Sequence, residues 1–258
     1  DEVNGVEIVR RVIQSNWTTN LLKGTIIALP IINVYGFNQF SRDVPDGKDV
    51  NRSFPGNQDG SLASIVANLV THKILPHIDY GIDFHTGGAS RTNYPQIRYA
   101  AKDEKAAKIA EIFNAPYTMH SPLISGSLRA TADQLGKPIV VYEGGESLRF
   151  DPFAIKEALK GVRRVLLHEN MIEDKEPKKK PSILLKNSSW VRAEASGLFV
   201  PKKVSGKKVR TGQVIGVIDN PYNHFSQHVL SPKDGYIVGH NNMPLVHRGD
   251  ALFHIAEE

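Results

Sequence analysis

Cysteine is absent from the 258 residues of this chain. The protein therefore forms no disulfide bonds and offers no thiolate to a metal ion, so any metal must be held by histidine and carboxylate side chains. Long apolar runs are absent too. No stretch approaches the roughly 20 apolar residues that a membrane-spanning helix needs, and we expect no membrane partner.

A large excess of charge of either sign is also missing. The 32 Lys and Arg residues exceed the 27 Asp and Glu residues by 5, and the isoelectric point is about 9.2. This mildly basic balance favours acidic substrates and leaves nucleic-acid binding open. The lysine run at 178–180 has no aromatic side chains beside it on which bases could stack. The run is typical of a solvated linker, and we predict no nucleic-acid partner.

Two kinds of organisation follow one another along the chain. Residues 1–172 alternate amphipathic helical segments with short apolar strands, which predicts an α/β domain with a mixed sheet. Residues 173–181 are charged and bracketed by prolines, as in a linker. Residues 182–258 contain short β-type runs separated by turn residues, which predicts a small all-β domain. The expected elements of the first part include strands over 25–34 and 138–142 and helices over 61–75 and 152–168.

The all-β part is similar to the barrel-sandwich modules that carry lipoyl or biotin groups. Two stretches, 195–216 and 231–252, look like the two halves of such a module. Lys233 is the candidate for a modified lysine, but the Met-Lys-Met or Asp-Lys-Ala context of the carriers is missing. We therefore predict that Lys233 is unmodified.

The most informative motif is Asp-Phe-His-Thr-Gly-Gly at 83–88, which follows a segment at 78–82 that predicts a short buried strand. A histidine at the carboxyl end of an α/β strand lies where such folds bind ligands. Asp83 precedes His85 by two residues, so on an extended chain both side chains point to one side. The carboxylate can then accept the second ring N–H of the histidine, as metal-bound histidines usually require. The ordinary alternative is a strand-end histidine that is hydrogen-bonded in a loop.

Two more polar groups follow predicted strands. Asn51 and Arg52 are adjacent, and a planar guanidinium beside an amide suits binding a carboxylate or polarising a carbonyl. Glu143 leaves an apolar strand and enters a pair of glycines, where a partly buried carboxylate is a candidate general base. A solvated arginine in a turn and an ordinary strand-end acid are the respective alternatives.

Together with the residues at 1–5, Asp-Glu-Val-Asn-Gly, these motifs resemble the succinylglutamate desuccinylase/aspartoacylase family of the zinc carboxypeptidase clan. The resemblance covers about residues 1–165. In that family a His-Gly-Asp-Glu-x-x-Gly element supplies the first two metal ligands, and the resemblance assigns the second of them to Glu2. The Asp-x-His-Thr-Gly motif assigns the third ligand to His85. The first ligand, a histidine two residues before Asp1, is expected upstream of this chain.

The resemblance also implies roles for other residues. Glu143 matches the catalytic glutamate, and Asn51 and Arg52 match the pair that holds the substrate, with Arg52 also polarising the scissile carbonyl or stabilising the oxyanion. Arg129, within 126–129, resembles another contact to the substrate carboxylate. The family implies one Zn²⁺ per subunit in the intact protein, with an open position for water. The implied reaction is hydrolysis of the amide bond of a small N-acyl amino acid, and a C-terminal peptidase is the nearby variant.

From the family pattern we expect this chain to be an N-terminally truncated part of a longer protein, with one or two further strands upstream. Two protein ligands bind zinc much less well than three, so we expect the chain as it stands to bind the metal of the intact protein weakly or not at all. We expect a cytoplasmic protein, but the absence of a visible secretion signal is no ground for this, because the start of the chain is truncated. A homo-oligomer is compatible with the sequence.

The alternative from another functional class is a non-catalytic carrier or binding protein. It would work through the lipoyl-like β domain, with the α/β domain degenerate. The remaining histidines show no paired ligand spacing, although a side chain from the β domain is a further candidate to reach over the site: His224, His228, His240 or His247. Zinc content and amidase activity of the full-length protein distinguish the two functions.

Overall fold

The computed structural model describes residues 1–222 and 225–258. Its helices are α1 (Val3–Gln14), α2 (Asn16–Thr19), α3 (Val34–Asn38), α4 (Leu62–Lys73), α5 (Glu104–Phe113), α6 (Leu128–Gln134) and α7 (Pro152–His168), with 3-10 turns η1 (Val50–Arg52) and η2 (Leu75–His77). The strands of the main sheet are β1 (Gly81–Gly87), β2 (Arg91–Tyr99), β3 (Tyr117–His120), β4 (Ile139–Glu146), β5 (Ile183–Leu185), β6 (Asn187–Arg192), β8 (Lys208–Val209), β11 (Gly235–Asn241) and β13 (Ala251–Glu257).

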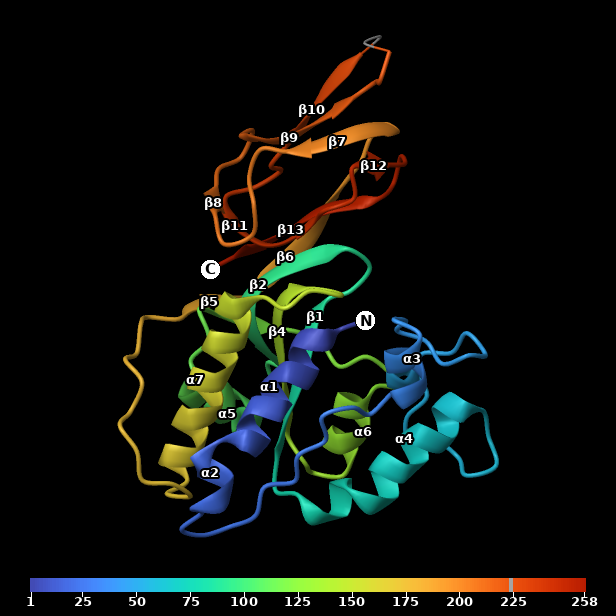
Figure 1. Cartoon of the computed structure of the whole chain (residues 1–258). Helices are drawn as coiled ribbons and strands as arrows, with labels where there is room; N and C mark the ends of the chain where they lie inside the picture. The colour runs from blue at the N-terminus through green and yellow to red at the C-terminus, as the bar shows by residue number, and fades with distance from the viewer. Residues whose placement is uncertain (223–224) are drawn as a thin grey trace.

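These strands form one mixed sheet (Figure 1). Hydrogen bonds connect them in the order β1-β4-β2-β11-β13-β6, with β3 attached to β2, β5 to β3 and β8 to β11. Strand β4 runs parallel to β1 but antiparallel to β2, while β3 runs parallel to β2. The predicted mixed α/β fold is therefore confirmed.

Residues just before the helices fix where four of them begin. Ser61, Asp103, Ser127 and Asp151 precede α4, α5, α6 and α7, and each side chain accepts a backbone N–H from the first turn. These bonds satisfy donors that a helix start leaves unpaired. At the other end of α5, Asn114 adopts the left-handed conformation that commonly ends a helix.

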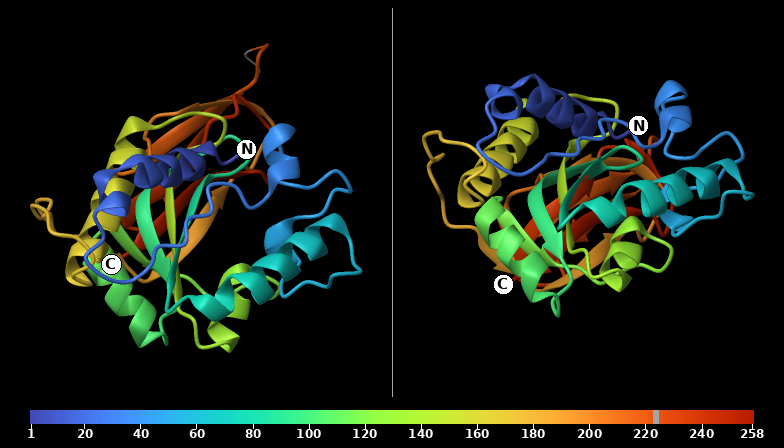
Figure 2. Two further views of the ribbon diagram at one scale, coloured as in Figure 1. Left: turned by 60° about the horizontal axis from the view of Figure 1, so that its bottom comes forward. Right: turned by 90° about the horizontal axis from the view of Figure 1, so that it is seen from below.

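Successive residues of the central strands alternate between the two faces of the sheet. Phe84 of β1 and Tyr142 of β4 belong to a core that includes residues of α1, α5 and α7. Asp83, His85 and Glu143 lie at the alternate positions and therefore on the opposite face of the sheet. On that face a second core joins α4, α6 and the loop around η1, so helices cover both sides of the sheet (Figure 2). The polar residues lie at the carboxyl ends of β1 and β4.

A glycine lets α5 and α7 approach closely. A Cβ on Gly161 would lie 2.4 Å from ring atoms of Phe113, whose side chain is fully buried. Overpacking of a core typically costs about 1–3 kcal/mol, while Gly→Ala inside a helix gains about 1 kcal/mol. Because the ring cannot move into solvent, we expect Gly161→Ala to lower the free energy of unfolding by about 1–2 kcal/mol. Chemical denaturation measures this, with the exposed Lys156→Ala in the same helix as the control. Equal stability of the two variants would contradict the packing argument.

The prediction of a strand over 25–34 is wrong. Residues 25–29 form neither helix nor strand, and Ile27 and Leu29 remain 40% and 38% exposed. This apolar run pairs with no strand of the sheet. It lines the same cavity as β1, which is the edge strand of the main sheet. The strand expected over 78–82 is also shifted: β1 begins at Gly81 and continues through His85.

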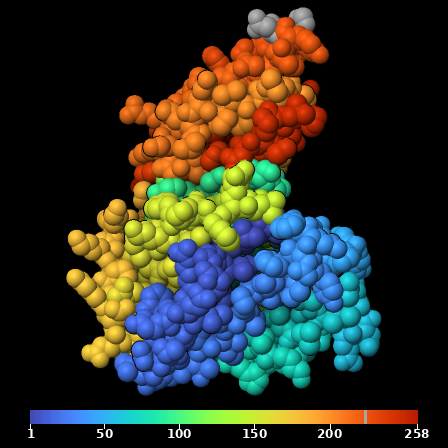
Figure 3. Space-filling view, viewed as in Figure 1, coloured from blue at the N-terminus to red at the C-terminus, as the bar shows by residue number. Residues whose placement is uncertain are grey.

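The C-terminal part adds a four-stranded antiparallel sheet in the order β10-β9-β7-β12. Its strands are β7 (Gly197–Pro201), β9 (Val214–Asp219), β10 (Ser226–Leu230) and β12 (Leu245–Val246). A core that includes Phe199, Ile215 and Phe253 lies between this sheet and the C-terminal strands of the main sheet. Figure 3 shows these C-terminal residues stacked on the α/β part of the molecule.

The two parts of the chain are joined by more than the linker. Strand β11 pairs with β2, so the main sheet continues from the α/β part into the C-terminal part. Residues 173–181 have no helix or strand, and Asp174 contacts Trp17 and Arg163. The division into domains at 1–172 and 182–258 stays a prediction. No helix in the described part of the chain is long and apolar enough to span a bilayer.

Candidate functional site

Glu2 and His85 meet at the carboxyl end of β1. Oε2 of Glu2 lies 2.7 Å from Nδ1 of His85 and accepts the backbone N–H of Thr86 at 3.1 Å. The other ring nitrogen of His85, Nε2, lies 2.9 Å from Oδ2 of Asp83. The hydrogen bond expected between Asp83 and His85 is therefore present. Glu2 reaches the strand because it directly precedes α1, which packs against β1.

Opposite charges hold this group together. Burial by itself would raise the pKa of Glu2, but His85 and Arg42 outweigh burial and lower it to about 2. Burial would likewise lower the pKa of His85, but the carboxylates of Asp83 and Glu2 hold it well above its usual value. The pair therefore forms an ion pair in which the protonated imidazole donates a hydrogen bond to the ionised carboxylate. A cation bound by these two atoms would take the place of that proton.

The donor set fits part of a zinc site. Imidazole nitrogen and carboxylate oxygen are ligands that zinc accepts, and a carboxylate on the second ring nitrogen is the usual outer partner. Within residues 1–222 and 225–258, no three His, Cys, Asp or Glu side chains are arranged to hold a metal ion. Glu2 and His85 thus need a further ligand to make a structural or catalytic zinc centre.

Arg42 is a site residue that the sequence did not indicate. Its Nη1 lies 2.7 Å from Oε1 of Glu2, and its Nε lies 2.8 Å from Oδ2 of Asp49. Burial alone would lower the pKa of its guanidinium, but Glu2 and Asp49 raise it, with a smaller contribution from Glu143. A single arginine in an irregular loop carries no periodic or motif signal, so only the folded chain brings it to Glu2.

Glu143 lies beside His85 on the neighbouring strand. The two residues are direct partners in the parallel pairing of β1 with β4, so their side chains leave the same face of the sheet. The Glu143 carboxylate is held by strand β2: Asn93 Nδ2 donates to Oε2 at 2.9 Å, and Arg98 Nη1 lies 3.2 Å from Oε1. The sequence alone did not single out Asn93 and Arg98, although polar residues inside a buried strand are a signal.

The predicted substrate-binding residues lie in different environments. Asn51 is committed to the fold, since its Oδ1 accepts the backbone N–H of Leu128 at 2.9 Å. Arg52 is exposed, and its Nη1 donates to the carbonyl oxygen of Asn51 at 2.6 Å. Arg129 is buried; its Nη2 donates to Ser121 Oγ at 3.2 Å, whereas its Nη1 has no partner.

Arg129 belongs electrostatically to the same group of charges. Burial lowers the pKa of its guanidinium and Arg98 lowers it further, while Asp83 and Glu143 act in the opposite direction. A buried guanidinium with an unpaired N–H is costly unless a partner arrives. An anionic ligand is the kind of partner that this nitrogen lacks.

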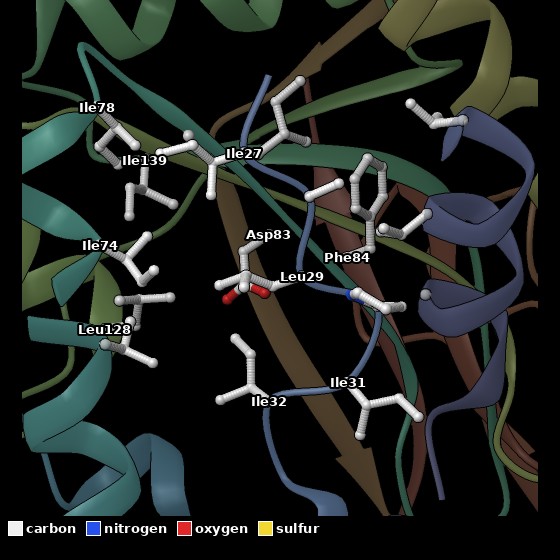
Figure 4. Close-up of a pocket in the computed structure, with 18 of the residues that line it drawn as sticks. Ile27, Leu29, Ile31, Ile32, Ile74, Ile78, Asp83, Phe84, Leu128 and Ile139 are labelled. Carbon is white, nitrogen blue, oxygen red and sulfur yellow. The ribbon is translucent and has the colours of Figure 1, made fainter. Parts of the chain in front are cut away.

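A cavity of about 810 Å³ opens beside the site, along the edge of β1. Figure 4 shows its apolar walls, with Ile27 and Leu29 of the irregular segment facing Ile74 and Ile139 on the opposite side. Glu2, Asp83 and His85 also line it. The cavity is thus lined mostly by apolar side chains, together with charged ones that include the candidate ligands.

The histidines proposed to reach the site from the C-terminal part differ in position. His240 lies on β11, which pairs with β2, and burial lowers its pKa while Glu146 opposes the shift. His228 lies on β10 of the other sheet, and His247 directly follows β12. His224 lies outside the described residues.

Comparison with known proteins extends the sequence resemblance. Residues 1–169 match the family described as the succinylglutamate desuccinylase/aspartoacylase catalytic domain. The whole chain is also similar to the N-alpha-acetyl-L-2,4-diaminobutyric acid deacetylase of Halomonas elongata. The two sequences are 28% identical over 271 residues, which cover 100% of this chain and 79% of that protein.

Solved structures share the fold. The product-bound ectoine utilization protein EutE (DoeB) from Ruegeria pomeroyi superposes with a TM-score of 0.89 at 23% identity, covering 100% of this chain and 82% of that chain. A succinylglutamate desuccinylase/aspartoacylase from Rhodobacter sphaeroides gives a TM-score of 0.87 at 24% identity, with the same coverage. At these identities the likeness concerns the fold.

Proposed function

Because the chain belongs to the succinylglutamate desuccinylase/aspartoacylase family, we propose that it is a zinc-dependent hydrolase that cleaves the amide bond of small N-acyl amino acids. The observation that carries the proposal is the contact between Glu2 Oε2 and His85 Nδ1, which lie 2.7 Å apart, beside Glu143 on the next strand. A carboxylate and an imidazole that converge next to a second carboxylate are the components of a metal-assisted hydrolytic site.

Glu2 and His85 would hold the zinc ion, with Nδ1 of His85 as donor and Asp83 keeping Nε2 protonated. A histidine two positions before Asp1 would be the third protein ligand. The cavity along the open edge of β1 is lined by Asp1 as well, and so leaves room for a segment that brings such a histidine to the site. When bound, the zinc ion would supply Lewis-acid activation of a water molecule.

Glu143 would move the proton. Its carboxylate accepts a proton from the attacking water and then gives it to the amine that leaves, so that the C–N bond breaks and a carboxylic acid and an amine are released. A carboxylate has about four acceptor positions, and the bonds from Asn93 and Arg98 occupy two of them. Acceptor capacity for the water therefore remains.

The arginines would bind and polarise the substrate. The unpartnered Nη1 of Arg129 suits the carboxylate of the amino-acid portion. Arg52, exposed beside Asn51, would turn its guanidinium toward the scissile carbonyl and stabilise the oxyanion. Arg42 is already paired with Glu2 and Asp49, and would fix the orientation of Glu2.

The carrier alternative has less support. The family match covers the α/β part that this alternative treats as degenerate. Lys233 lies 3.1 Å from Glu257 in an ion pair, and its unmodified state stays a prediction. The zinc-dependent deacylase is the better proposal.

The proposal predicts both metal and activity in the full-length protein. We expect about one zinc per chain by elemental analysis, and release of free amine from an N-acyl amino acid such as N-acetyl-L-2,4-diaminobutyric acid or N-succinylglutamate. A dipeptide with a free carboxylate tests the peptidase variant. Zinc-loaded protein that cleaves none of these amides would overturn the proposed function.

A further inference from the structure

Both oxygens of the Glu143 carboxylate are contacted by side chains of one neighbouring strand. Asn93 donates to Oε2 at 2.9 Å and Arg98 lies 3.2 Å from Oε1, and both residues belong to β2. The side chains of Arg98 and Glu143 are 21% and 13% exposed, so water competes weakly for these contacts. Two donors on the two oxygens fix the rotation of the carboxylate as well as its position.

A bulge in β2 allows Asn93 and Arg98 to contact the same carboxylate. In the pairing of β2 with β4, Gln96 lies opposite Glu143 while Asn93 lies opposite Gly145, so three steps along β2 match two along β4. In a regular strand, residues three apart point to opposite faces. The extra residue returns Asn93 to the face that carries Glu143, which is the re-aiming of a side chain that bulges provide.

A glycine from the C-terminal part supports Asn93 from the other side. Gly239 of β11 is the pairing partner of Asn93, and a Cβ at Gly239 would lie only 2.6 Å from Asn93 Oδ1. Any other residue at position 239 would push the amide of Asn93, which is 8% exposed and has little room to move. Strand β11 is therefore in contact with Asn93, which donates a hydrogen bond to Glu143.

We propose that Asn93 and Arg98 are positioning residues that orient Glu143 for proton transfer, and that Gly239 of β11 keeps Asn93 in place. The inference rests on the proposed function, in which Glu143 is the general base. It gives the C-terminal part a role in catalysis, because its strand β11, which pairs with β2, helps to set the orientation of the base. A misplacement of about 1 Å at a reacting group can cost about 10²-fold in rate.

The test measures kcat and KM for Arg98→Met, Arg98→Lys, Asn93→Ala and Gly239→Ala in the zinc-loaded full-length protein. We expect Arg98→Met and Asn93→Ala to lower kcat by about 10–10²-fold, with KM within about threefold and zinc content unchanged. Arg98→Lys keeps a cation near Glu143 and should recover part of kcat. The matched control is Arg149→Met, which removes an exposed arginine paired with Glu146 at 3.5 Å and should leave kcat unchanged.

The role of Gly239 is tested by a double-variant cycle. Gly239→Ala should slow kcat in the wild-type background but add nothing to Asn93→Ala, because the oxygen that the new methyl group would displace is then gone. Additive losses of kcat would overturn the link through Asn93. Wild-type kcat in both Arg98→Met and Asn93→Ala would overturn the positioning role while leaving the proposed function intact, whereas an inactive wild-type protein would overturn both.

Discussion

Glu143→Gln in the full-length protein is expected to lower kcat by about 10²–10⁴-fold, the usual contribution of a general base, with zinc content unchanged. Glutamine keeps the shape of the side chain but does not accept the proton of the attacking water at neutral pH. Its NH₂ group also replaces one of the two carboxylate oxygens that accept contacts from Asn93 and Arg98. Steady-state kinetics together with elemental analysis of zinc measure the effect.

The matched control is Glu146→Gln, three residues further along the same strand. Glu146 is paired with the exposed Arg149, and we expect its amide variant to keep kcat within about threefold of wild type. Full activity of Glu143→Gln with zinc bound would remove Glu143 from the mechanism. Loss of activity in Glu146→Gln instead would make Glu146 the base.

His85→Ala is expected to lose the metal itself. The variant removes the imidazole that lies 2.7 Å from Glu2, and the ligands that remain hold zinc poorly. We expect little zinc after dialysis and a corresponding loss of hydrolysis. Asp83→Asn should act more mildly, lowering zinc affinity by about 10–100-fold, as changes to the outer partner of a metal-bound histidine typically do.

His72→Ala is the control for general effects of removing a histidine, because His72 is exposed on α4. It should bind zinc and hydrolyse substrate as the wild type does. Circular dichroism of each variant separates metal loss from unfolding. Wild-type zinc content in folded His85→Ala would exclude His85 as a ligand.

Local patterns predicted much of the fold and the centre of the site. Asp83 and His85 alternate along one strand, so their hydrogen bond follows from the two-residue period of an extended chain. Glu143 follows an apolar run, and pairing of the two parallel strands sets it beside His85. The helices predicted over 61–75 and 152–168 correspond to α4 and α7, whose starts depend on local bonds such as those from the first turn of α7 to Asp151.

The parts that sequence did not predict depend on contacts between distant segments. Arg42 forms an ion pair with Glu2 from a loop whose sequence has no repeating pattern. Asn93 lies on the same face of the sheet as Glu143 only because of a bulge in β2. Position 239 needs glycine because β11, more than a hundred residues after β2 in the sequence, pairs with β2 at Asn93. The run at 25–34 has strand-like composition, yet forms no strand, because β propensity depends on a partner to pair with.

The central claim is that hydrolysis at this site depends on zinc held by Glu2 and His85. The most direct measurement strips metal from the full-length protein with a chelator and follows amine release from an N-acyl amino acid as Zn²⁺ is added back. Activity that is absent without metal and rises to a plateau at about one zinc per chain, in wild type but not in His85→Ala, is the predicted result. Undiminished hydrolysis by the metal-free protein would contradict it.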